Sequence, residues 1–482
     1  CQKIVMTTYY SYQWDLNYSN PIVFNEMLNN ILYMMNRGVD IIVFNATSNM
    51  WKKAGTSCRN LPQAYLIIQM INLAMEIVCP GSAAMFDIKR HKKKNDDEQE
   101  NKNIHLNSNS VTNESNGILN DDESESENEQ DFIITDSGVI TADAHADLNH
   151  HKSDDSETED SEDIDIDFDY STEIGKVHYN NGWISRLWAS LAFGNVHSIS
   201  YSINVICNRF AGDCYMVNVQ KHDDINWGYG FDVENSSLIG NGKGSSDGFR
   251  GGIISLYRYL NDYYQGNMPG LFSRGITFAE DIVTGKARIC GRTASLLGLE
   301  SALEEEKNAM KKIQVKKDEN KKIGNSLIQK LKNSKRNIQT SIDRILLMHA
   351  VTFSMPSIVT VYSGDEIGHL NDYSYVNCPE IRQDTRYLQR GAFDWESAKL
   401  IESDKDSYQS KIFNGIKELI NARKKCPFFT ECERTIFFKS YSRNEYFNND
   451  QENSYKDSQE FEVDDTLLIF KRIRNDGKFL FF

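Results

Sequence analysis

Apolar residues in the first part of the chain follow two spacings, one typical of helices and one typical of buried strands. The run at 39–46, entered after Gly38, is rich in Val and Ile and predicts a buried strand of a parallel sheet. Helical spacing at 23–37 and again at 63–78 predicts a helix on each side of it. Parallel α/β proteins carry their functional residues at the carboxyl ends of strands. Asn45 is therefore expected to face a site, with an amide where chemistry usually uses a carboxylate.

The same arrangement of an apolar run followed by polar residues recurs three times. The runs are 83–86 before Asp87, 214–219 before His222, Asp223 and Asp224, and 358–363 before Asp365 and Glu366. Further helices are expected around 183–193, 199–209 and 341–353. Strands that alternate with helices and end in polar residues predict an α/β fold, and we expect the later strands of a partial (β/α)8 TIM barrel.

The longest apolar stretch, 345–362, is about long enough to suggest a membrane span, but His349 and Pro356 interrupt it. A helix followed by a strand accounts for it better, so no membrane span is expected. The 300–335 stretch before it is highly charged with a helical pattern, and we expect a solvated extension. Short β runs at 435–438, 466–472 and 479–482 predict a small, truncated C-terminal β domain.

The net charge of −16 is concentrated in one segment of the chain. Between Asn95 and Glu173 there are 26 acidic and 2 basic side chains, whereas the other 403 residues carry 43 acidic and 51 basic ones. A segment so charged and so poor in apolar residues cannot offset its ordering entropy, so a disordered acidic insertion is expected. The predicted division is a first part of the barrel at 1–90, the insertion at 91–176, the remainder of the barrel at 177–428 and an incomplete β domain at 429–482.

Nine cysteines are scattered along the chain, without zinc-type pairs or the density of a secreted disulfide scaffold. This usage indicates a reducing compartment, and a cytoplasmic protein is expected. The sequence begins at Cys1 instead of Met and enters structured sequence at once, so we expect a fragment of a longer chain.

Polar residues at strand ends have a structural explanation as well as a functional one. A single Asp in this position is more often a helix cap or a loop hydrogen-bonding group than a catalyst. His222, Asp223 and Asp224 form a sharper signal, because three polar groups after a buried strand must be paired or functional. Such groups at strand ends suit glycoside chemistry, in which one carboxylate attacks the anomeric carbon and another protonates the leaving oxygen.

Several long motifs resemble the amylosucrase branch of the α-amylase glycoside hydrolase family. The segments are QWDLNYSNPIVFNEM, GTSCRNLPQAY, HDDINW, TGKARICGRTASLLGLE and GDEIGHLNDYSY. The likeness runs from about Val5 to Asp87 and from about Tyr179 to Pro427, interrupted by the acidic insertion and by extra residues near 304–335. It implies a retaining glucosyltransferase that cleaves sucrose, holds glucose on a carboxylate and passes it to an α-1,4-glucan or to water.

The resemblance also implies roles for individual residues. Asp223 matches the residue that stabilises the transition state, with His222 beside it as a sugar-binding residue. Arg386 is similar to the arginine that closes the base of the glucose subsite. Asp87 falls where the family carries its general-acid Glu, and Asn45 falls where the family carries its nucleophilic Asp in an Arg-Met-Asp-Ala sequence.

The departures from the family pattern concern catalysis. With Val43 and Asn45, this chain lacks both the nucleophile and the arginine that orients it, and Asp87 is one methylene shorter than Glu. The family's first three barrel strands would precede Cys1, together with a subsite histidine and the acidic partner of Arg386. Either a longer natural chain supplies these parts or this polypeptide cannot close a barrel.

Two functions therefore stay open. One is an active sucrose or α-glucan glucosyltransferase or glycoside hydrolase with an unrecognised nucleophile. The other is an inactive or strongly impaired pseudoenzyme kept as a glucan-binding or scaffold protein. Loss of a nucleophile costs roughly 10⁴ to 10⁶ in rate, which favours the second. The expected ligand is sucrose or an α-glucan, and the acidic segment is a candidate for recruiting a protein partner. No motif indicates nucleic acid, a membrane, a metal or another cofactor, and no residue is assigned to the calcium that some family members bind.

Overall fold

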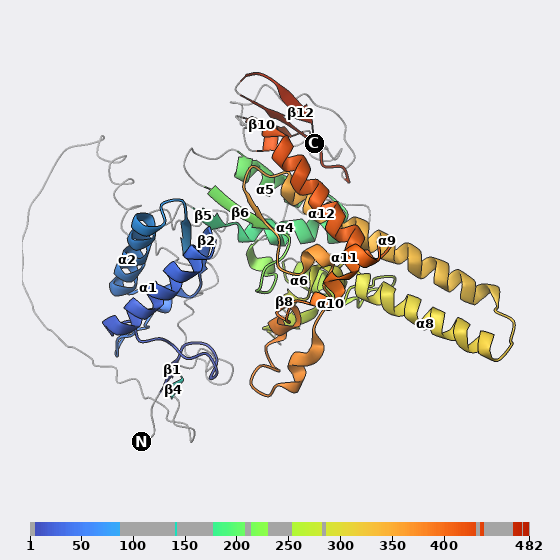
Figure 1. Cartoon of the computed structure of the whole chain (residues 1–482), viewed down its shortest axis with the longest axis horizontal. Helices are drawn as coiled ribbons and strands as arrows, with labels where there is room; N and C mark the ends of the chain where they lie inside the picture. The colour runs from blue at the N-terminus through green and yellow to red at the C-terminus, as the bar shows by residue number, and fades with distance from the viewer. Residues whose placement is uncertain are drawn as a thin grey trace, which may run out of the picture. The chain divides into compact units, whose positions relative to one another are not determined.

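The computed structural model describes residues 5–86, 140–141, 177–207, 214–229, 253–281, 286–429, 434–437, 466–474 and 476–481. The chain divides into two compact units, Cys1–Asp155 with Tyr170–Lys176 and Ser156–Asp169 with Val177–Phe482. Each unit contains parallel strands connected through helices, so the predicted α/β class is confirmed (Figure 1). The finer four-part division stays a prediction.

Helix α1 (Pro21–Asn36) opens the first unit, and local sequence explains where it begins. The side-chain oxygen of Asn20 accepts a hydrogen bond from the Ile22 N–H (3.0 Å), while Pro21 occupies the first turn, where its missing N–H has no helical partner to lose. Ile31 and Met35 lie four positions apart and are buried on one face of the helix. The helix thus begins two residues before the predicted range.

Strands β2 (Ile41–Phe44) and β3 (Ala83–Phe86) form a two-stranded parallel sheet, with Ile41 opposite Ala83 and Phe44 opposite Phe86. The rings of Phe44 and Phe86 stack with centroids 4.8 Å apart. Helix α2 (Pro62–Val78) connects the two strands and packs against β3. Its buried side chains are Ala64, Ile67, Ile68, Ile71 and Met75.

A second, minimal parallel pair joins β1 (Met6–Thr7) to β4 (Ile140–Thr141). Strand β4 is the part of the predicted acidic insertion that the structure describes. The rest of that insertion lies outside the described residues, as does Asp87, which directly follows β3. The expected disorder therefore stays a prediction.

The second unit is built on a parallel sheet with the strand order β5-β6-β9, formed by β5 (Val177–Tyr179), β6 (Cys214–Asn218) and β9 (Ile358–Thr360). Helices α4 (Asn181–Phe193) and α5 (His197–Cys207) connect β5 to β6. The core beside this sheet is aromatic. The Trp188 indole N–H donates to the carbonyl of Val219 (2.8 Å), and the Tyr264 hydroxyl donates to the carbonyl of Trp188 (2.5 Å), so these large side chains are buried with their polar atoms paired.

Helix α6 (Ile253–Gln265) precedes an antiparallel pair, β7 (Ile276–Phe278) and β8 (Arg288–Cys290), and the short helix α7 (Thr293–Leu296). Ile225, in the loop after β6, forms an antiparallel bridge with Ile289 of β8. This bridge fixes the loop that carries His222 and Asp223.

Helices α8 (Leu299–Asp318) and α9 (Asn325–Phe353) pack along one another as an antiparallel pair. The apolar stretch at 345–362 is the end of α9 followed by β9, as predicted. Within the described residues, no helix combines the length and apolar character needed to span a membrane.

The remaining elements are α10 (Trp395–Ala398), α11 (Leu400–Ser403), α12 (Tyr408–Lys425) and an antiparallel sheet of β10 (Arg434–Phe437), β11 (Phe470–Ile473) and β12 (Phe479–Phe481). The sheet confirms the β runs predicted near the C-terminus. Phe470 belongs to the core of the second unit.

A barrel would join the parallel strands in one continuous sheet. In the described residues they form separate sheets, β2 with β3 and β5 with β6 and β9. The partial (β/α)8 barrel therefore stays a prediction. Short parallel strands connected through helices, the units from which such a barrel is built, are present in both units of the chain.

Candidate functional site

The loop after β6 carries three of the predicted polar residues, and both of its ends are fixed. Strand β6 holds one end, and at the other the Ile225 N–H donates to the Ile289 carbonyl (2.9 Å) while the Ile289 N–H donates back (3.1 Å). Between them lie His222 and Asp223, whose side chains are 39% and 35% exposed. The two side chains are therefore positioned by a rigid frame while still reaching solvent.

Two arginines converge on the carboxylate of Asp223. Nη2 of Arg390 donates to Oδ1 of Asp223 (2.8 Å), Nη1 of Arg386 lies 3.7 Å from the same oxygen, and Nε2 of His222 lies 3.4 Å from Oδ2. Burial by itself would raise the pKa of Asp223, but the charges of His222 in its protonated form, of Lys221 and of the two arginines outweigh it and lower that pKa below its ordinary value. Asp223 is thus an ionised carboxylate at neutral pH.

Asp384 orients both arginines. This buried carboxylate accepts hydrogen bonds from Nε and Nη2 of Arg386, each at 2.8 Å, a fork geometry that fixes the guanidinium plane. Its Oδ2 also lies 3.8 Å from Nη1 of Arg390. The ring of Phe278 lies under the Arg386 guanidinium at 4.6 Å. We call His222, Asp223, Asp384, Arg386 and Arg390 the Asp223 cluster.

Gln389 joins the backbone of the two loops that form this cluster. Its Nε2 donates to the carbonyls of Asp223 (2.6 Å) and Lys221 (3.1 Å), and its Oε1 accepts a hydrogen bond from the Gly291 N–H (2.8 Å). Nε of Arg390 donates to the carbonyl of His222 (2.8 Å), which adds a second connection. Hydrogen bonds from side chains to main-chain groups, as well as charge, thus hold the arginines close to the Asp223 carboxylate.

His222 is neutral at physiological pH. Burial lowers its pKa, and the charges of Arg390, Lys221 and Arg386 lower it further, against the opposite effect of Asp223. A neutral imidazole carries one hydrogen-bond donor and one acceptor, both of which suit hydroxyl groups.

The strand end at β9 has a different environment. Asp365 is buried and accepts a hydrogen bond from the Thr293 hydroxyl (2.9 Å), and its Oδ2 lies 4.0 Å from Nε2 of His349, which is also buried. Burial raises the pKa of Asp365 to about 7 and lowers the pKa of His349 to about 4. This pair is enclosed in the protein and is not part of the Asp223 cluster.

Asn45 follows β2 in the first unit and is an exposed residue. Asp87 lies outside the described residues. The structure therefore brings together three of the five predicted site residues, His222, Asp223 and Arg386, all of them within the second unit. The roles assigned to Asn45 and Asp87 stay predictions.

Sequence reasoning missed Asp384, Gln389 and Arg390. The sequence contained a sign of them, because residues 383–390 combine three charged residues with Gln389 in a short segment. Arg390 follows Arg386 by four positions, yet spacing alone does not show that both turn toward a loop more than 160 residues earlier in the chain.

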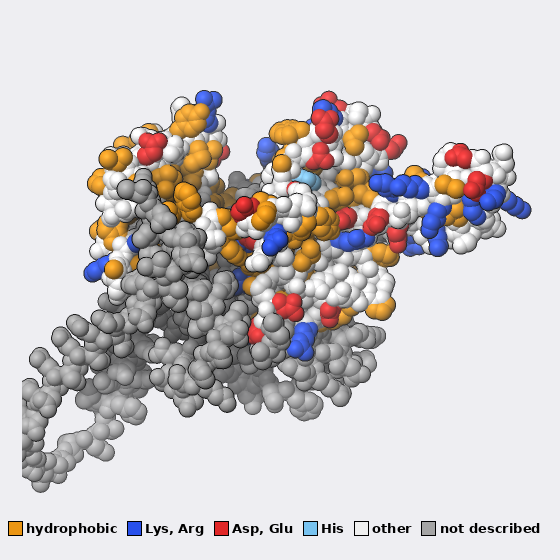
Figure 2. Space-filling model, turned by 90° about the horizontal axis from the view of Figure 1, so that it is seen from below, with side chains coloured by type: hydrophobic (Ala, Val, Ile, Leu, Met, Phe, Trp, Pro, Cys, Tyr) orange, Lys and Arg blue, Asp and Glu red, His pale blue; other side chains and the backbone are white. Residues whose placement is uncertain are grey.

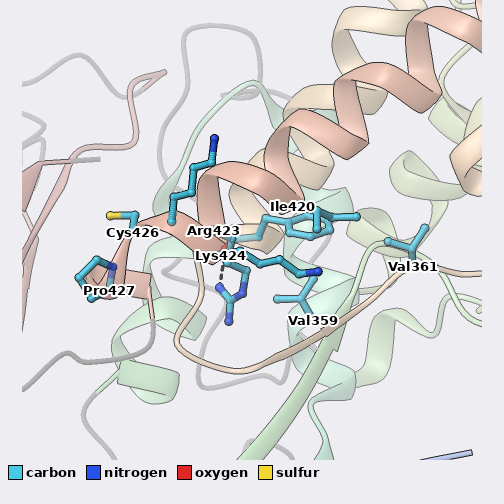
Figure 3. A pocket seen from close by; sticks show the side chains of 9 residues that line it. Val359, Val361, Ile420, Arg423, Lys424, Cys426 and Pro427 are labelled. Carbon is cyan, nitrogen blue, oxygen red and sulfur yellow. Dashed lines mark hydrogen bonds between the residues drawn. The ribbon is translucent and has the colours of Figure 1, made fainter. Parts of the chain in front are cut away.

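A cavity of about 540 Å³ lies elsewhere in the second unit, between the C-terminal part of α12 and β9 (Figure 3). It is lined by Phe353, Val359, Val361, Ile420, Arg423, Lys424, Lys425, Cys426 and Pro427. Arg423 is occupied in capping α9, since it donates to the carbonyls of Phe353, Met355 and Ser357 at 2.6 to 2.7 Å. None of the lining residues belongs to the Asp223 cluster, so we place the candidate site by its chemistry and not by the cavity.

In the part of the chain that the structure covers, no group of three or more His, Cys, Asp or Glu residues is arranged to hold a metal ion. The Asp223 cluster itself supplies two carboxylates, two guanidinium groups and an imidazole.

The sequence matches to curated proteins cover only a short stretch of the chain. No family model matches the chain. The glucosylglycerate phosphorylases of Allomeiothermus silvanus and Escherichia coli are 37% and 36% identical over 79 and 76 residues, each match covering 16% of this chain and 14% of that protein. The trehalose synthase/amylase TreS of Mycolicibacterium smegmatis is 32% identical over 73 residues, 15% of this chain and 12% of that protein.

Among solved structures, sucrose 6F-phosphate phosphorylase from Thermoanaerobacter thermosaccharolyticum aligns with a TM-score of 0.46 and 12% identity, over 99% of this chain and 66% of that chain. An α-amylase from H. orenii aligns with a TM-score of 0.39 and 10% identity, over 98% of this chain and 56% of that chain. These similarities are too weak to assign a fold.

Proposed function

We propose that this chain is the glucosyl-binding part of an α-amylase-family protein, starting from the family relationship that the sequence matches support. Those matches do not single out the amylosucrases. Within the family we place the chain in the amylosucrase branch because of its long motifs, and we take sucrose or an α-glucan as its ligand.

The observation that carries this proposal is the state of Asp223. Its carboxylate stays ionised, is held in place by Arg390 at 2.8 Å and keeps a third of its side chain exposed. Sugar hydroxyls are hydrogen-bond donors as well as acceptors, and a fixed, accessible carboxylate is a strong acceptor for them. His222, half-exposed beside it, adds a neutral partner for a second hydroxyl.

We do not expect this chain to turn over a glucoside efficiently. Retaining transfer needs an ionised carboxylate at the anomeric carbon with an acid about 5 to 5.5 Å away, and the nucleophile position holds Asn45. A neutral amide gives no anionic stabilisation to a transition state with oxocarbenium character. Sugar binding is thus expected to persist where catalysis is lost or strongly impaired.

Calorimetric titration of the chain with sucrose and with maltotriose tests the proposal. Binding is expected for at least one of them, and Asp223→Ala weakens it by about 1 to 3 kcal/mol because charge-assisted hydrogen bonds are lost. Asp476→Ala is the matched control, since it removes the same charge from an exposed turn before β12 and leaves the affinity unchanged. No heat of binding from the native chain would overturn the carbohydrate assignment.

A further inference from the structure

Helices α8 and α9 form an arm that projects from the second unit (Figure 1), with the connecting turn at 319–324 at its outer end. Ala309 on α8 and Ser334 on α9 are buried, and such small side chains let two helices pack closely. At the base, Nε of Arg274 donates to the hydroxyl of Ser301 (2.8 Å) and its guanidinium pairs with Glu304. The arm is therefore a packed two-helix rod anchored to the body of the unit.

The outer part of this rod, residues 307–336, is strongly basic. It contains eleven Lys and Arg side chains against two acidic ones, Asp318 and Glu319. Lys321 pairs with Glu319 (3.0 Å), and among the described residues no other Lys or Arg of this stretch has a salt-bridge partner. Figure 2 shows these basic side chains gathered along the arm. Three consecutive Glu at 304–306 lie at the base, so the positive charge is concentrated at the outer end.

Apolar side chains on the arm do not form a face that could enter a membrane surface. Met310, Val315 and Ile328 are 46%, 54% and 41% exposed. Met310 and Val315 lie five positions apart on α8, which separates them by about 140° around the helix. Helices that lie in a membrane interface need one continuous apolar face. The lysines lie on several sides of the rod. This arrangement suits a partner with dense negative charge in three dimensions better than it suits a flat membrane surface.

We propose that this arm binds the phosphate backbone of duplex nucleic acid without reading its sequence. A duplex presents one negative charge per about 1.7 Å of its axis. This dense negative charge complements the excess of Lys and Arg on the rigid rod at 307–336. No Phe, Tyr or Trp occurs between residues 299 and 352, so the arm has no ring on which an unpaired base could stack. Ten of the eleven basic residues are Lys. The Lys ammonium group is a compact charge that suits phosphate, whereas bidentate hydrogen bonds to base edges suit the planar guanidinium group of Arg.

Fluorescence anisotropy of the full 482-residue chain with a labelled DNA duplex of mixed sequence, about 20 base pairs long, tests this inference. Binding is expected at low salt, and raising the salt from 50 to 200 mM weakens it by about 10³-fold or more if six or more phosphates are contacted. Two unrelated duplex sequences bind equally. Four outer lysines are then replaced together by Gln: Lys312, Lys316, Lys317 and Lys322.

This variant lowers the salt slope by about 0.9 for each lost contact and weakens binding at 100 mM salt by at least about 10²-fold. Replacement of the same four lysines by Arg retains binding, because the charge is kept. A matched control removes four exposed lysines outside the arm, and its affinity and slope stay native: Lys399, Lys405, Lys411 and Lys417. Circular dichroism checks that each variant keeps its helices, which Gln favours about as well as Lys does.

Three outcomes would overturn the proposal. The first is no duplex binding at 50 mM salt. The second is binding to phosphatidylserine vesicles, lost in the four-Gln variant, with no binding to the duplex. The third is binding of labelled polyglutamate more tightly than the duplex at equal charge concentration and equal salt, which would identify an acidic protein as the partner.

Discussion

The carboxyl ends of β2 and β6 look alike in sequence and differ in structure. Each strand is short, apolar and parallel to a neighbour, and each is followed by polar residues. After β2 stands Asn45, an exposed amide. After β6 stands Asp223, a carboxylate held by Arg390 and facing Arg386, with Asp384 buried behind both.

This difference shows that groups from elsewhere in the chain decide the environment of a strand end. Arg386 and Arg390 lie more than 160 residues beyond Asp223, and their charges offset the cost of burying its carboxylate. The amide of Asn45 carries no charge and cannot act as a nucleophilic carboxylate does. We therefore propose ligand binding at the end of β6 and a lost catalytic role at the end of β2.

Restoring the family's catalytic residues at the ends of β2 and β3 should produce the largest change. We expect no measurable fructose release from sucrose by the native chain, and partial recovery when Val43→Arg, Asn45→Asp and Asp87→Glu are combined. Loss of a nucleophile lowers the rate by roughly 10⁴ to 10⁶. The side chain of Asp87 is shorter than that of Glu, and a misplacement of the donated proton by about 1 Å can lower the rate about 10²-fold. The measurement is fructose released over time.

Asn45→Gln in the otherwise native chain serves as the control for this experiment, since it changes the side chain without adding a carboxylate. Native turnover within about tenfold of the triple variant, a gap of only about 1.4 kcal/mol in barrier, would contradict the lost catalytic role and indicate a nucleophile elsewhere.

Removing Asp384 should affect stability more than removing Asp223. Asp384→Ala leaves the largely buried guanidinium groups of Arg386 and Arg390 without their buried carboxylate, and breaking a buried pair in this way costs about 3 to 5 kcal/mol. Asp223→Ala removes a carboxylate that is a third exposed, and a much smaller loss of stability is expected. Urea unfolding of both variants measures the difference.

Equal destabilisation by these two substitutions would mean that Asp223 is a structural residue like Asp384, and the contrast between the two carboxylates would be lost. Asp384→Asn is a useful intermediate, because it removes the charge and keeps one of the two acceptor oxygens that Arg386 uses.

The strand end at β9 sharpens the comparison through pH. Asp365, with its pKa raised to about 7, stays protonated in the folded chain while the unfolded chain ionises near pH 4, so its contribution to stability falls as pH rises from about 4 to 7. His349, with its pKa lowered to about 4, stays neutral while the unfolded chain is protonated below about 6.5, so its contribution rises with pH over about 4 to 6.5. The two trends oppose one another in the native chain.

Single substitutions should therefore uncover each trend in urea unfolding at several pH values. Asp365→Asn is expected to gain stability relative to the native chain as pH rises from 4 to 7. His349→Gln is expected to lose stability relative to the native chain over pH 4 to 6.5. Flat differences for both variants would show that neither group is held in its neutral form.

Much of the local structure followed from the sequence. The pattern at 63–78 predicted α2 within one residue, and the apolar run at 83–86 is strand β3, because both combine a clear period with Pro or Gly punctuation. His222, Asp223 and Arg386 came from a resemblance to long motifs. Asp384 and Arg390 were not predicted, because their role depends on a contact between distant loops that no local pattern encodes. The continuous barrel also depends on such pairing, and the described strands do not show it.

We propose that this chain binds a glucosyl ligand and does not turn it over, and both halves of this proposal can be measured on one sample. A single preparation of the native chain is titrated with sucrose in a calorimeter, and fructose is then assayed in the cell contents after prolonged incubation. We expect a saturable heat of binding that Asp223→Ala weakens, with no fructose above the protein-free control. Fructose release that needs the native chain, or the absence of any binding heat for sucrose and maltotriose alike, would contradict it.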